Sequence, residues 1–352
     1  MGTYNVAVYG ASGHTGRFVA NELERRGVVV QRIARGTPTD SHSQKDGRQL
    51  PWMRASCDEP EALDRALEGT DAVINCAGPF LDTAPAVVEA ALRVGTHYLD
   101  IAAEQRSVRQ TLATYAGEAM DKGIVVLPAM AFFGGLADLL VAQLCLGLRT
   151  IDEILIGVAL DYWHPTVGTR RTGARNTARR VIVSGWRLVP LPAPPARGRW
   201  RFPQPFGDLL VASVPLAEII TISKHIAATR IESFLNEVSL EDLGKADTPP
   251  PTSVEASGRS DQTFVMDVSV SADGVSKRIA AFGRDIYAVS APLVVEACMR
   301  VLSQNNRKGG TFAPAELFDA QEFLAALSSD IRVELISQPR PMEPFNEIEV
   351  KA

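Results

Sequence analysis

Three glycines near the start of the chain are spaced to hold a dinucleotide. The apolar run VAVY (residues 6–9) leads directly into GASGHTGR, where Gly10, Gly13 and Gly16 precede a predicted helix. The first glycine permits a tight turn, the second lets the backbone approach a pyrophosphate, and the third allows a helix to pack closely on a strand. The phosphates would then meet free N–H groups at the start of the helix. The nucleotide-binding residues expected here are Gly10, Ser12, Gly13, His14, Thr15, Gly16 and Arg17.

The end of the second predicted strand indicates which dinucleotide binds. Proteins that select NAD usually place an acid there for the ribose hydroxyls, but this chain has Ala34-Arg35-Gly36, and its first acid downstream is Asp40. The planar, permanently charged guanidinium of Arg35 suits a 2′-phosphate, and Arg17 lies on the same side. We therefore predict NADP(H) rather than NAD(H). The alternative is that Arg35 is a solvated loop residue, which leaves the preference open.

A second loop, NCAGP at residues 75–79, ends the apolar strand that begins at Ala72. Gly78 and Pro79 allow the backbone to approach a ligand while fixing the turn. We expect the loop to pass the nicotinamide half of the cofactor, and the alternative is an ordinary connection between a strand and a helix. The residues expected to contact the cofactor are Asn75, Cys76, Ala77, Gly78 and Pro79.

Candidate catalytic side chains follow the strand predicted over residues 98–101. Tyr98 and Asp100 share one face of a regular strand, and either can hydrogen-bond to a substrate or to the nicotinamide ribose. The alternatives are that Tyr98 only packs and that Asp100 caps the next helix. Glu104 is a predicted substrate-binding residue. His164 is a predicted proton donor, although a single loop histidine often has no chemical role.

Residues 162–207 carry nine arginines, no lysine and no acid. Arg171, Arg175 and Arg179 recur every four residues, so on a helix they form one basic stripe. We expect Arg171 and Arg175 to bind an anionic substrate. The alternatives are a solvated face or pairing with acids of a partner subunit. The proline-rich stretch 190–205 is expected to be an ordered but irregular lid or dimer arm.

Alternating strands and helices up to about residue 150 predict a doubly wound parallel sheet, since parallel strands need crossover helices. Apolar residues with a period of two at 154–160 and 264–270, and a turn signal at 272–274, then predict a largely antiparallel sheet. A helix over 291–304 is expected to return to the first domain. The predicted strands are 5–9, 28–34, 72–76, 98–101 and 124–127, and the predicted helices are 15–26, 59–67, 84–94 and 104–122. The expected domains are 1–150 for NADP(H), 151–290 for substrate and dimerisation, and 291–352 as return helices.

Composition limits the classes of partner. A net charge of −5 argues against general nucleic-acid binding, and four scattered cysteines suit neither a disulfide framework nor a metal site. The apolar stretch 123–148 is interrupted by Pro128 and by Gly134-Gly135, so a buried strand, turn and helix are favoured over a membrane span. We expect a cytoplasmic homodimer that acts on a small molecule, without nucleic acid, membrane or metal.

Three runs, DAVINCAGPF (71–80), GTHYLDIAAE (95–104) and GRDIYAVSAPLVVEA (283–297), make the chain resemble the saccharopine-dehydrogenase-like NADP-binding family. That family includes saccharopine reductases and trans-acting enoyl reductases. The resemblance implies a Rossmann domain, a mixed-sheet substrate domain and hydride transfer involving NADP(H) or NAD(H). Residues 131–136 stand where relatives often have a Gly-Phe-Asp-Pro-Gly-like turn, and the missing acid argues against saccharopine itself as substrate.

These features together favour an NADP(H)-dependent oxidoreductase that reduces a C=N or activated C=C bond of a small anionic metabolite. One alternative is a redox sensor that binds NADP(H) without turnover, as some NmrA-like regulators do. Another is a catalytically silent scaffold that uses the nucleotide for stability. A substantial second domain and the arginine-rich segment favour the enzyme.

Overall fold

Seven parallel strands form the first sheet in this computed structural model, which describes residues 4–36, 50–303, 308–337 and 341–344. The strand order is β15-β6-β5-β4-β1-β2-β3, so the chain leaves β1 first toward one edge and then toward the other. Six strands come from the first 127 residues and β15 comes from the C-terminal part. Their bounds are β1 (Asn5–Tyr9), β2 (Val29–Ala34), β3 (Met53–Arg54), β4 (Ala72–Asn75), β5 (His97–Asp100), β6 (Val125–Leu127) and β15 (Gly310–Thr311).

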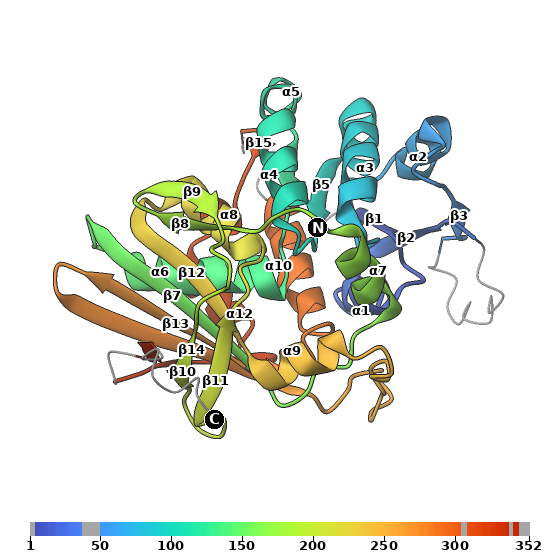
Figure 1. Cartoon of the computed structure of the whole chain (residues 1–352). Helices are drawn as coiled ribbons and strands as arrows, with labels where there is room; N and C mark the ends of the chain where they lie inside the picture. Colours follow the sequence, from blue (N-terminus) through green and yellow to red (C-terminus); the bar gives the residue numbers. More distant parts are fainter. Residues whose placement is uncertain (1–3, 37–49, 304–307, 338–340, 345–352) are drawn as a thin grey trace.

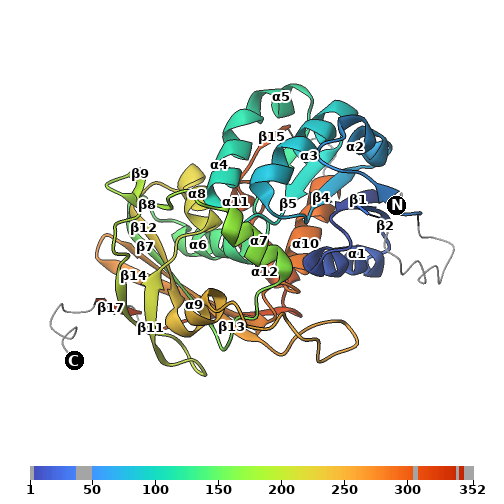
Figure 2. The same ribbon diagram turned by 45° about the vertical axis from the view of Figure 1, so that its right-hand side comes forward.

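Helices cover both faces of this sheet, as Figures 1 and 2 show. Val6 and Val8 of β1 pack into the cluster that includes α1 and α10, whereas the alternating Ala7 and Tyr9 pack into the cluster that includes α2 and α3. The predicted doubly wound fold is therefore confirmed. The helices are α1 (His14–Arg25), α2 (Pro60–Leu67), α3 (Phe80–Val94), α4 (Gln105–Thr114), α5 (Ala116–Asp121) and α10 (Ser290–Ser303).

The second sheet is mixed. Its order is β16-β14-β13-β7-β12-β11-β10-β17, with β8 and β9 attached at β12. The hairpin of β13 and β14 turns through Asp273 and Gly274, which both have positive φ, as the sequence predicted. The pair β7 and β12 is parallel, and all other pairs in this sheet are antiparallel. The strands are β7 (Ile151–Leu160), β8 (Val181–Ser184), β9 (Arg187–Pro190), β10 (Arg197–Arg201), β11 (Asp208–Ser213), β12 (Ala228–Asn236), β13 (Thr263–Ala272), β14 (Val275–Arg284), β16 (Ile331–Leu335) and β17 (Met342–Pro344).

The prediction that residues 190–205 are irregular is wrong for β10, which pairs with β11 and β17 in the second sheet. The buried Trp200 lies on Gly157 of β7, where a Cβ atom would come within 2.3 Å of the indole ring. Its Nε1–H also donates to Oδ2 of Asp267 at 2.8 Å. The sequence of β10 suggests an exposed segment, but the single large side chain of Trp200 fixes this strand in the fold.

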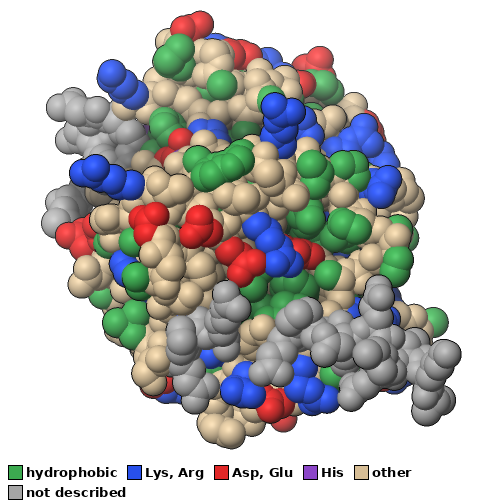
Figure 3. Space-filling model, turned by 60° about the vertical axis from the view of Figure 1, so that its left-hand side comes forward, with side chains coloured by type: hydrophobic (Ala, Val, Ile, Leu, Met, Phe, Trp, Pro, Cys, Tyr) green, Lys and Arg blue, Asp and Glu red, His purple; other side chains and the backbone are tan. Residues whose placement is uncertain are grey.

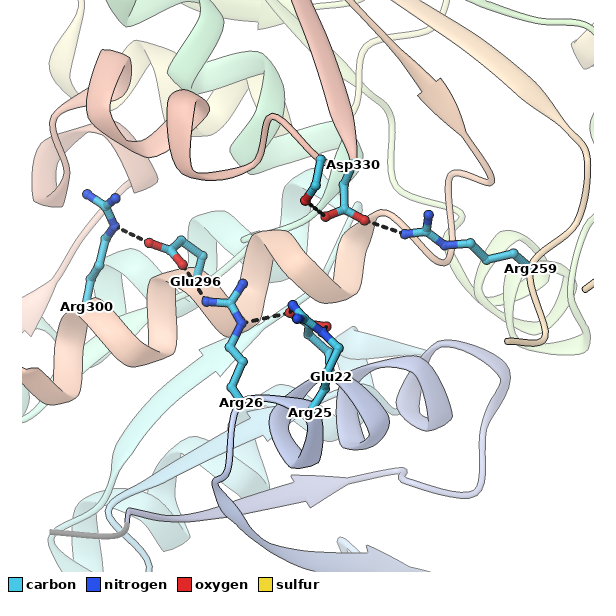
Figure 4. A network of polar contacts seen from close by, with 8 residues as sticks. Glu22, Arg25, Arg26, Arg259, Glu296, Arg300 and Asp330 are labelled. Atoms are coloured by element: carbon cyan, nitrogen blue, oxygen red, sulfur yellow. Dashed lines mark hydrogen bonds and ion pairs between the residues drawn. The ribbon is translucent and has the colours of Figure 1, made fainter. Parts of the chain in front are cut away.

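The C-terminal part joins both halves of the molecule. Figure 4 shows Arg26, the C-cap residue of α1, bonded to Glu296 of α10 at 2.5 Å, and Glu296 in turn pairs with Arg300 at 2.7 Å. The expected return helix therefore packs on the first sheet, but β16 and β17 pair with strands of the second. The remaining helices of the second half are α6 (Ala137–Cys145), α7 (Val167–Arg175), α8 (Ala217–His225), α9 (Glu237–Gly244), α11 (Pro314–Leu317) and α12 (Ala320–Ala326).

The apolar stretch 123–148 is part of the core. It forms β6, the π-helix η1 (Phe132–Leu136) and α6, which the second sheet covers. Among the described residues, no helix has both the length and the apolar composition to cross a membrane. Figure 3 shows acidic and basic side chains interspersed on the face that carries the second sheet, with apolar side chains between them.

Candidate functional site

The glycine turn has the shape that its sequence predicts. Gly10 has a φ of +81°, and a Cβ atom there would lie 2.8 Å from the Cβ of Ala77. A Cβ atom on Gly16 would lie 2.2 Å from the carbonyl oxygen of Gly10, so α1 starts in direct contact with the turn. Since Ala77 belongs to the loop of residues 75–79, the structure brings the two predicted cofactor segments together.

Helix α1 begins at this turn without a capping side chain. Gly13 is the N-cap residue and no side chain accepts a hydrogen bond there, which suits the binding of an anion. Ser12 and Arg17 are exposed, and Thr15 faces the adjoining cavity. Arg35 is exposed just after β2, and Asp40 lies outside the described residues. Their contacts with a nucleotide remain a prediction.

His14 packs rather than reaching into solvent. Its ring lies edge-on to Phe18 and Tyr287, with centroid separations of 5.3 and 5.4 Å. Burial lowers the pKa of His14, and the charge of Arg17 lowers it further, so the ring is neutral at pH 7. Its Nε2 is buried without a hydrogen-bond partner.

The loop of residues 75–79 is shaped by Asn75. Its Oδ1 accepts the N–H of Ala77 at 3.0 Å, and its Nδ2 donates to the hydroxyls of Thr83 at 3.2 Å and Tyr98 at 3.3 Å. Asn75 is fully buried, so it holds the loop from behind. Cys76 and Gly78 line the cavity, and Pro79 is the N-cap residue of α3. Burial raises the pKa of the Cys76 thiol, which is therefore protonated at pH 7.

Tyr98 and Asp100 do not face the cavity, contrary to expectation. Both are fully buried, and the Tyr98 hydroxyl donates to Oδ2 of Asp100 at 2.8 Å. Oδ1 of Asp100 accepts the N–H groups of Ala102 at 2.9 Å and Ala129 at 2.7 Å, which ties the ends of β5 and β6 together. The geometry therefore gives these two residues a structural role, the alternative that the sequence had left open.

Glu104, the predicted substrate-binding residue, does reach the cavity, unlike Tyr98 and Asp100. It is buried but lines the cavity, and its Oε1 accepts the N–H of Phe80 at 2.9 Å. Burial raises the pKa of Glu104, against the lowering effect of the backbone N–H groups of Phe80 and Ala103, and the nearby charge of Asp100 also raises it. A carboxyl group in this position can hold a proton closer to neutral pH than a solvated one.

The cavity itself has a volume of about 410 Å³ and is lined by residues of both halves of the molecule. Phe133 and Trp163 stack along one wall, with ring centroids 5.8 Å apart, and Phe132 packs edge-on against Phe133 at 4.9 Å. Helix α7 lines the cavity beside the loop of residues 75–79, since a Cβ atom on Gly78 would come within 2.7 Å of Oγ1 of Thr172. The lining is mostly apolar.

The arginines that reach this cavity differ from those predicted. Arg171 is exposed, and Arg175 pairs with Asp82 at 2.8 Å. Neither lines the cavity, whereas Arg170 and Arg180 do. Helix α7 ends at Arg175, so the expected stripe does not extend to residue 179.

His164 also lies away from the cavity. Its ring packs against Tyr162 with centroids 4.4 Å apart, and its neighbour Trp163 lines the cavity instead. The structure therefore offers no support for His164 as a proton donor.

Tyr287 is a site residue that the residue-type analysis did not single out. Its hydroxyl accepts Nε1–H of Trp163 at 2.8 Å and lies 2.9 Å from the hydroxyl of Thr169 at the start of α7. It thus connects the glycine turn, the aromatic wall and α7. In the sequence, Tyr287 lies within the run 283–297, which carries part of the family resemblance.

Comparison with known proteins agrees with this geometry. Residues 6–127 match the family model of the saccharopine dehydrogenase NADP binding domain, which confirms the resemblance and the expected cofactor over that segment. The saccharopine dehydrogenase-like oxidoreductase of Mus musculus is 27% identical over 154 residues, which are 39% of this chain and 36% of that protein. The trans-acting enoyl reductase of Mycobacterium bovis is 24% identical over 147 residues, or 40% of this chain and 35% of that protein. The matched segment thus spans about a third of the length of these curated relatives.

The whole fold has a counterpart among solved structures. Apo saccharopine dehydrogenase (L-Glu forming) from Saccharomyces cerevisiae superposes with a TM-score of 0.68 at 13% identity. The superposition covers 95% of this chain and 100% of that one. The two proteins therefore share the combination of a Rossmann sheet and a second mixed sheet, which is a likeness of fold alone.

Proposed function

Because residues 6–127 form a saccharopine dehydrogenase-type NADP binding domain, we propose that this protein is an NADP(H)-dependent oxidoreductase that acts on a small anionic metabolite. The observation that carries the proposal is that both cofactor segments open onto one apolar cavity, through Thr15, Cys76 and Gly78. NADPH, when bound, supplies a hydride to a C=N or activated C=C bond. The residues proposed to hold it are those of the glycine turn, Arg35 and the loop of residues 75–79.

Glu104 is the proposed proton donor. It is the one carboxylic acid among the described residues that line the cavity, and its raised pKa suits an acid that works near neutral pH. The N–H of Phe80 fixes its orientation, and Phe80 begins the helix that follows the loop of residues 75–79. The acid and the loop thus keep a constant relative position.

Arg180 is the proposed contact for the negative charge of the substrate, in place of Arg171 and Arg175. It is half-buried at the cavity wall, where a guanidinium binds a carboxylate or phosphate more strongly than in open solvent. Phe133 and Trp163 would hold the apolar part of the substrate. We further propose that the protein is cytoplasmic and that it forms a homodimer. Light scattering of the purified protein tests the dimer.

The enzyme proposal is tested by following NADPH absorbance with a set of imines, enones and enoyl thioesters. Turnover of at least one class that is lost in Glu104→Gln would support the proposal. Tight NADPH binding with no turnover across all three classes would favour the sensor instead. That alternative has one structural argument, the close contact of His14 with Tyr287, which links the glycine turn to the second half of the molecule.

A further inference from the structure

A second hollow of about 180 Å³ adjoins the apolar cavity, between α4 and residues 176–181. Four arginines line it, and no acid does so among the described residues. They are Arg106, Arg109, Arg179 and Arg180. In a chain with a net charge of −5, such a concentration of one sign requires an explanation.

A specific contact holds together the two segments that carry these arginines. Gln105, at the start of α4, donates to the carbonyl oxygen of Val181 at 2.8 Å and accepts the N–H of Val181 at 2.8 Å. This pair of bonds fixes Arg180 beside α4. Arg106 and Arg109 are three residues apart on α4, so they lie on one face of the helix.

These positive charges have few counter-charges of their own. Arg106 and Arg109 make no ion pair within the described part of the chain, and Arg179 donates only to the carbonyl oxygen of Leu191, at 3.1 Å. Burial lowers the pKa of Arg180, although the charge of Glu218 acts in the opposite direction. Like charges gathered around one hollow raise its free energy when it is empty, most of all at the half-buried Arg180, and an anion relieves this repulsion.

The hollow is separate from the proposed cofactor segments but adjoins the substrate cavity. None of the glycine-turn residues or of residues 75–79 line it, whereas Asn176, Arg180 and Leu216 line both spaces. A ligand that fills both would place an apolar part beside Phe133 and Trp163 and a charged part among the arginines.

We propose that this arginine hollow, formed by Arg106, Arg109, Arg179 and Arg180, binds a phosphate or diphosphate group carried by the substrate. The proposal rests on the proposed oxidoreductase function and specifies its substrate class. Four guanidinium groups exceed what one carboxylate can neutralise, whereas a phosphate carries up to two negative charges and a diphosphate more. A volume equal to about six water molecules admits either group.

Inorganic pyrophosphate tests the hollow directly. The protein is first saturated with NADP+, so that the nucleotide's own phosphate sites are filled, and pyrophosphate is then titrated by calorimetry at low salt. We expect one binding event, weakened at least tenfold in Arg106→Gln/Arg109→Gln and in Arg180→Gln. The matched control, Arg171→Gln, removes an exposed arginine of the same segment that lines neither space, and should bind as the wild type does.

The two proposals fail in different ways. Wild-type protein that binds NADP+ but no pyrophosphate, or an equal loss in Arg171→Gln, overturns the arginine hollow and leaves the oxidoreductase proposal standing. Wild-type protein that binds no pyridine nucleotide overturns both. Arg106 and Arg109 are exposed, so the double variant is expected to fold. If Arg180→Gln fails to fold, pyrophosphate binding by the double variant alone tests the arginine hollow.

Discussion

The backbone N–H of Phe80 donates to Oε1 of Glu104 at 2.9 Å. Phe80 is the first residue of α3, and Glu104 directly precedes α4, so one hydrogen bond joins the starts of two neighbouring crossover helices. Because both helices follow strands of the first sheet at its carboxyl edge, this bond fixes the acid at the place where a nucleotide-binding sheet offers its ligand site.

Glu104→Gln should lower kcat for reduction by about 10² to 10⁴ while leaving NADPH affinity almost unchanged. The amide keeps an oxygen that accepts the Phe80 N–H but loses the acceptor of the longer Ala103 N–H contact at 3.2 Å, and it cannot give up a proton, so the main anchor is kept and acid catalysis is lost. Single-turnover kinetics with saturating NADPH would measure the effect. A variant that retains more than half of the wild-type rate would rule out Glu104 as the proton donor.

The same group predicts the pH dependence of the wild type. Burial raises the pKa of Glu104 above its ordinary value, and its protonated form is the active one in reduction. Reduction should therefore be fastest below that raised pKa and slow as the pH rises through it. If the pH profile of kcat for Glu104→Gln shows the same decline, the decline belongs to another group.

Arg35→Ala should weaken NADPH binding by about 10- to 100-fold and NADH binding by less than about threefold. The reason is that a charged hydrogen bond to phosphate contributes about 1.5 to 3 kcal/mol, and only NADPH carries the 2′-phosphate. Fluorescence titration with both nucleotides measures the ratio. Arg187→Ala, which removes an exposed arginine of β9, is the matched control and should change neither affinity. Equal losses for the two nucleotides in Arg35→Ala would contradict the role.

Gly16→Ala should abolish nucleotide binding and lower the free energy of unfolding by about 3 kcal/mol or more. The added Cβ atom would lie 2.2 Å from the carbonyl oxygen of Gly10, which is backbone and cannot rotate away. Gly117→Ala in α5 meets nothing within 4 Å and should stabilise the protein by about 0.5 to 1 kcal/mol. Thermal unfolding compares the two variants, and similar melting temperatures would mean that the turn tolerates a side chain.

The first sheet was predictable because its signals are local. Strands covered on both faces are short apolar runs, so β1, β4 and β5 were placed to within a residue at each end. The glycine turn was predictable for the same reason, since its steric demands involve Gly10 and Gly16 within one short segment. The helix predicted over 104–122 breaks at Tyr115, and the sequence did not reveal the break because the apolar pattern of α4 and α5 continues across it.

The site residues were less predictable because topology, not spacing, selects them. Periodicity places Tyr98 and Asp100 on one face of β5 but does not say whether that face meets a ligand or a packed layer. Trp163 and Tyr287 meet only because β7 and β14 end at the same edge of the second sheet. The prediction of a basic stripe was wrong because α7 ends at Arg175. The hydrogen bonds between Gln105 and Val181 then direct Arg180 inward.

Glu218 carries the last prediction, which concerns stability. It is buried in α8, and its Oε1 accepts the N–H of Leu216 at 2.8 Å and the hydroxyl of Ser233. Its Oε2 is buried without a hydrogen-bond partner. Burial raises the pKa of Glu218 to about 7, and Arg180 is the charged group that opposes this shift.

A carboxyl pKa that is higher in the folded than in the unfolded state favours the folded protein at low pH. The contribution is complete below about pH 4.5 and is lost as the pH rises to about 7, and it totals about 3 kcal/mol at 1.36 kcal/mol per pKa unit. Glu218→Gln cannot titrate, so its free energy of unfolding should fall less than that of the wild type between pH 5 and pH 8. Urea unfolding at four pH values measures the difference, with Glu68→Gln, at an exposed position, as the control. Parallel pH profiles for wild type and Glu218→Gln would show that the buried carboxyl is not the titrating group.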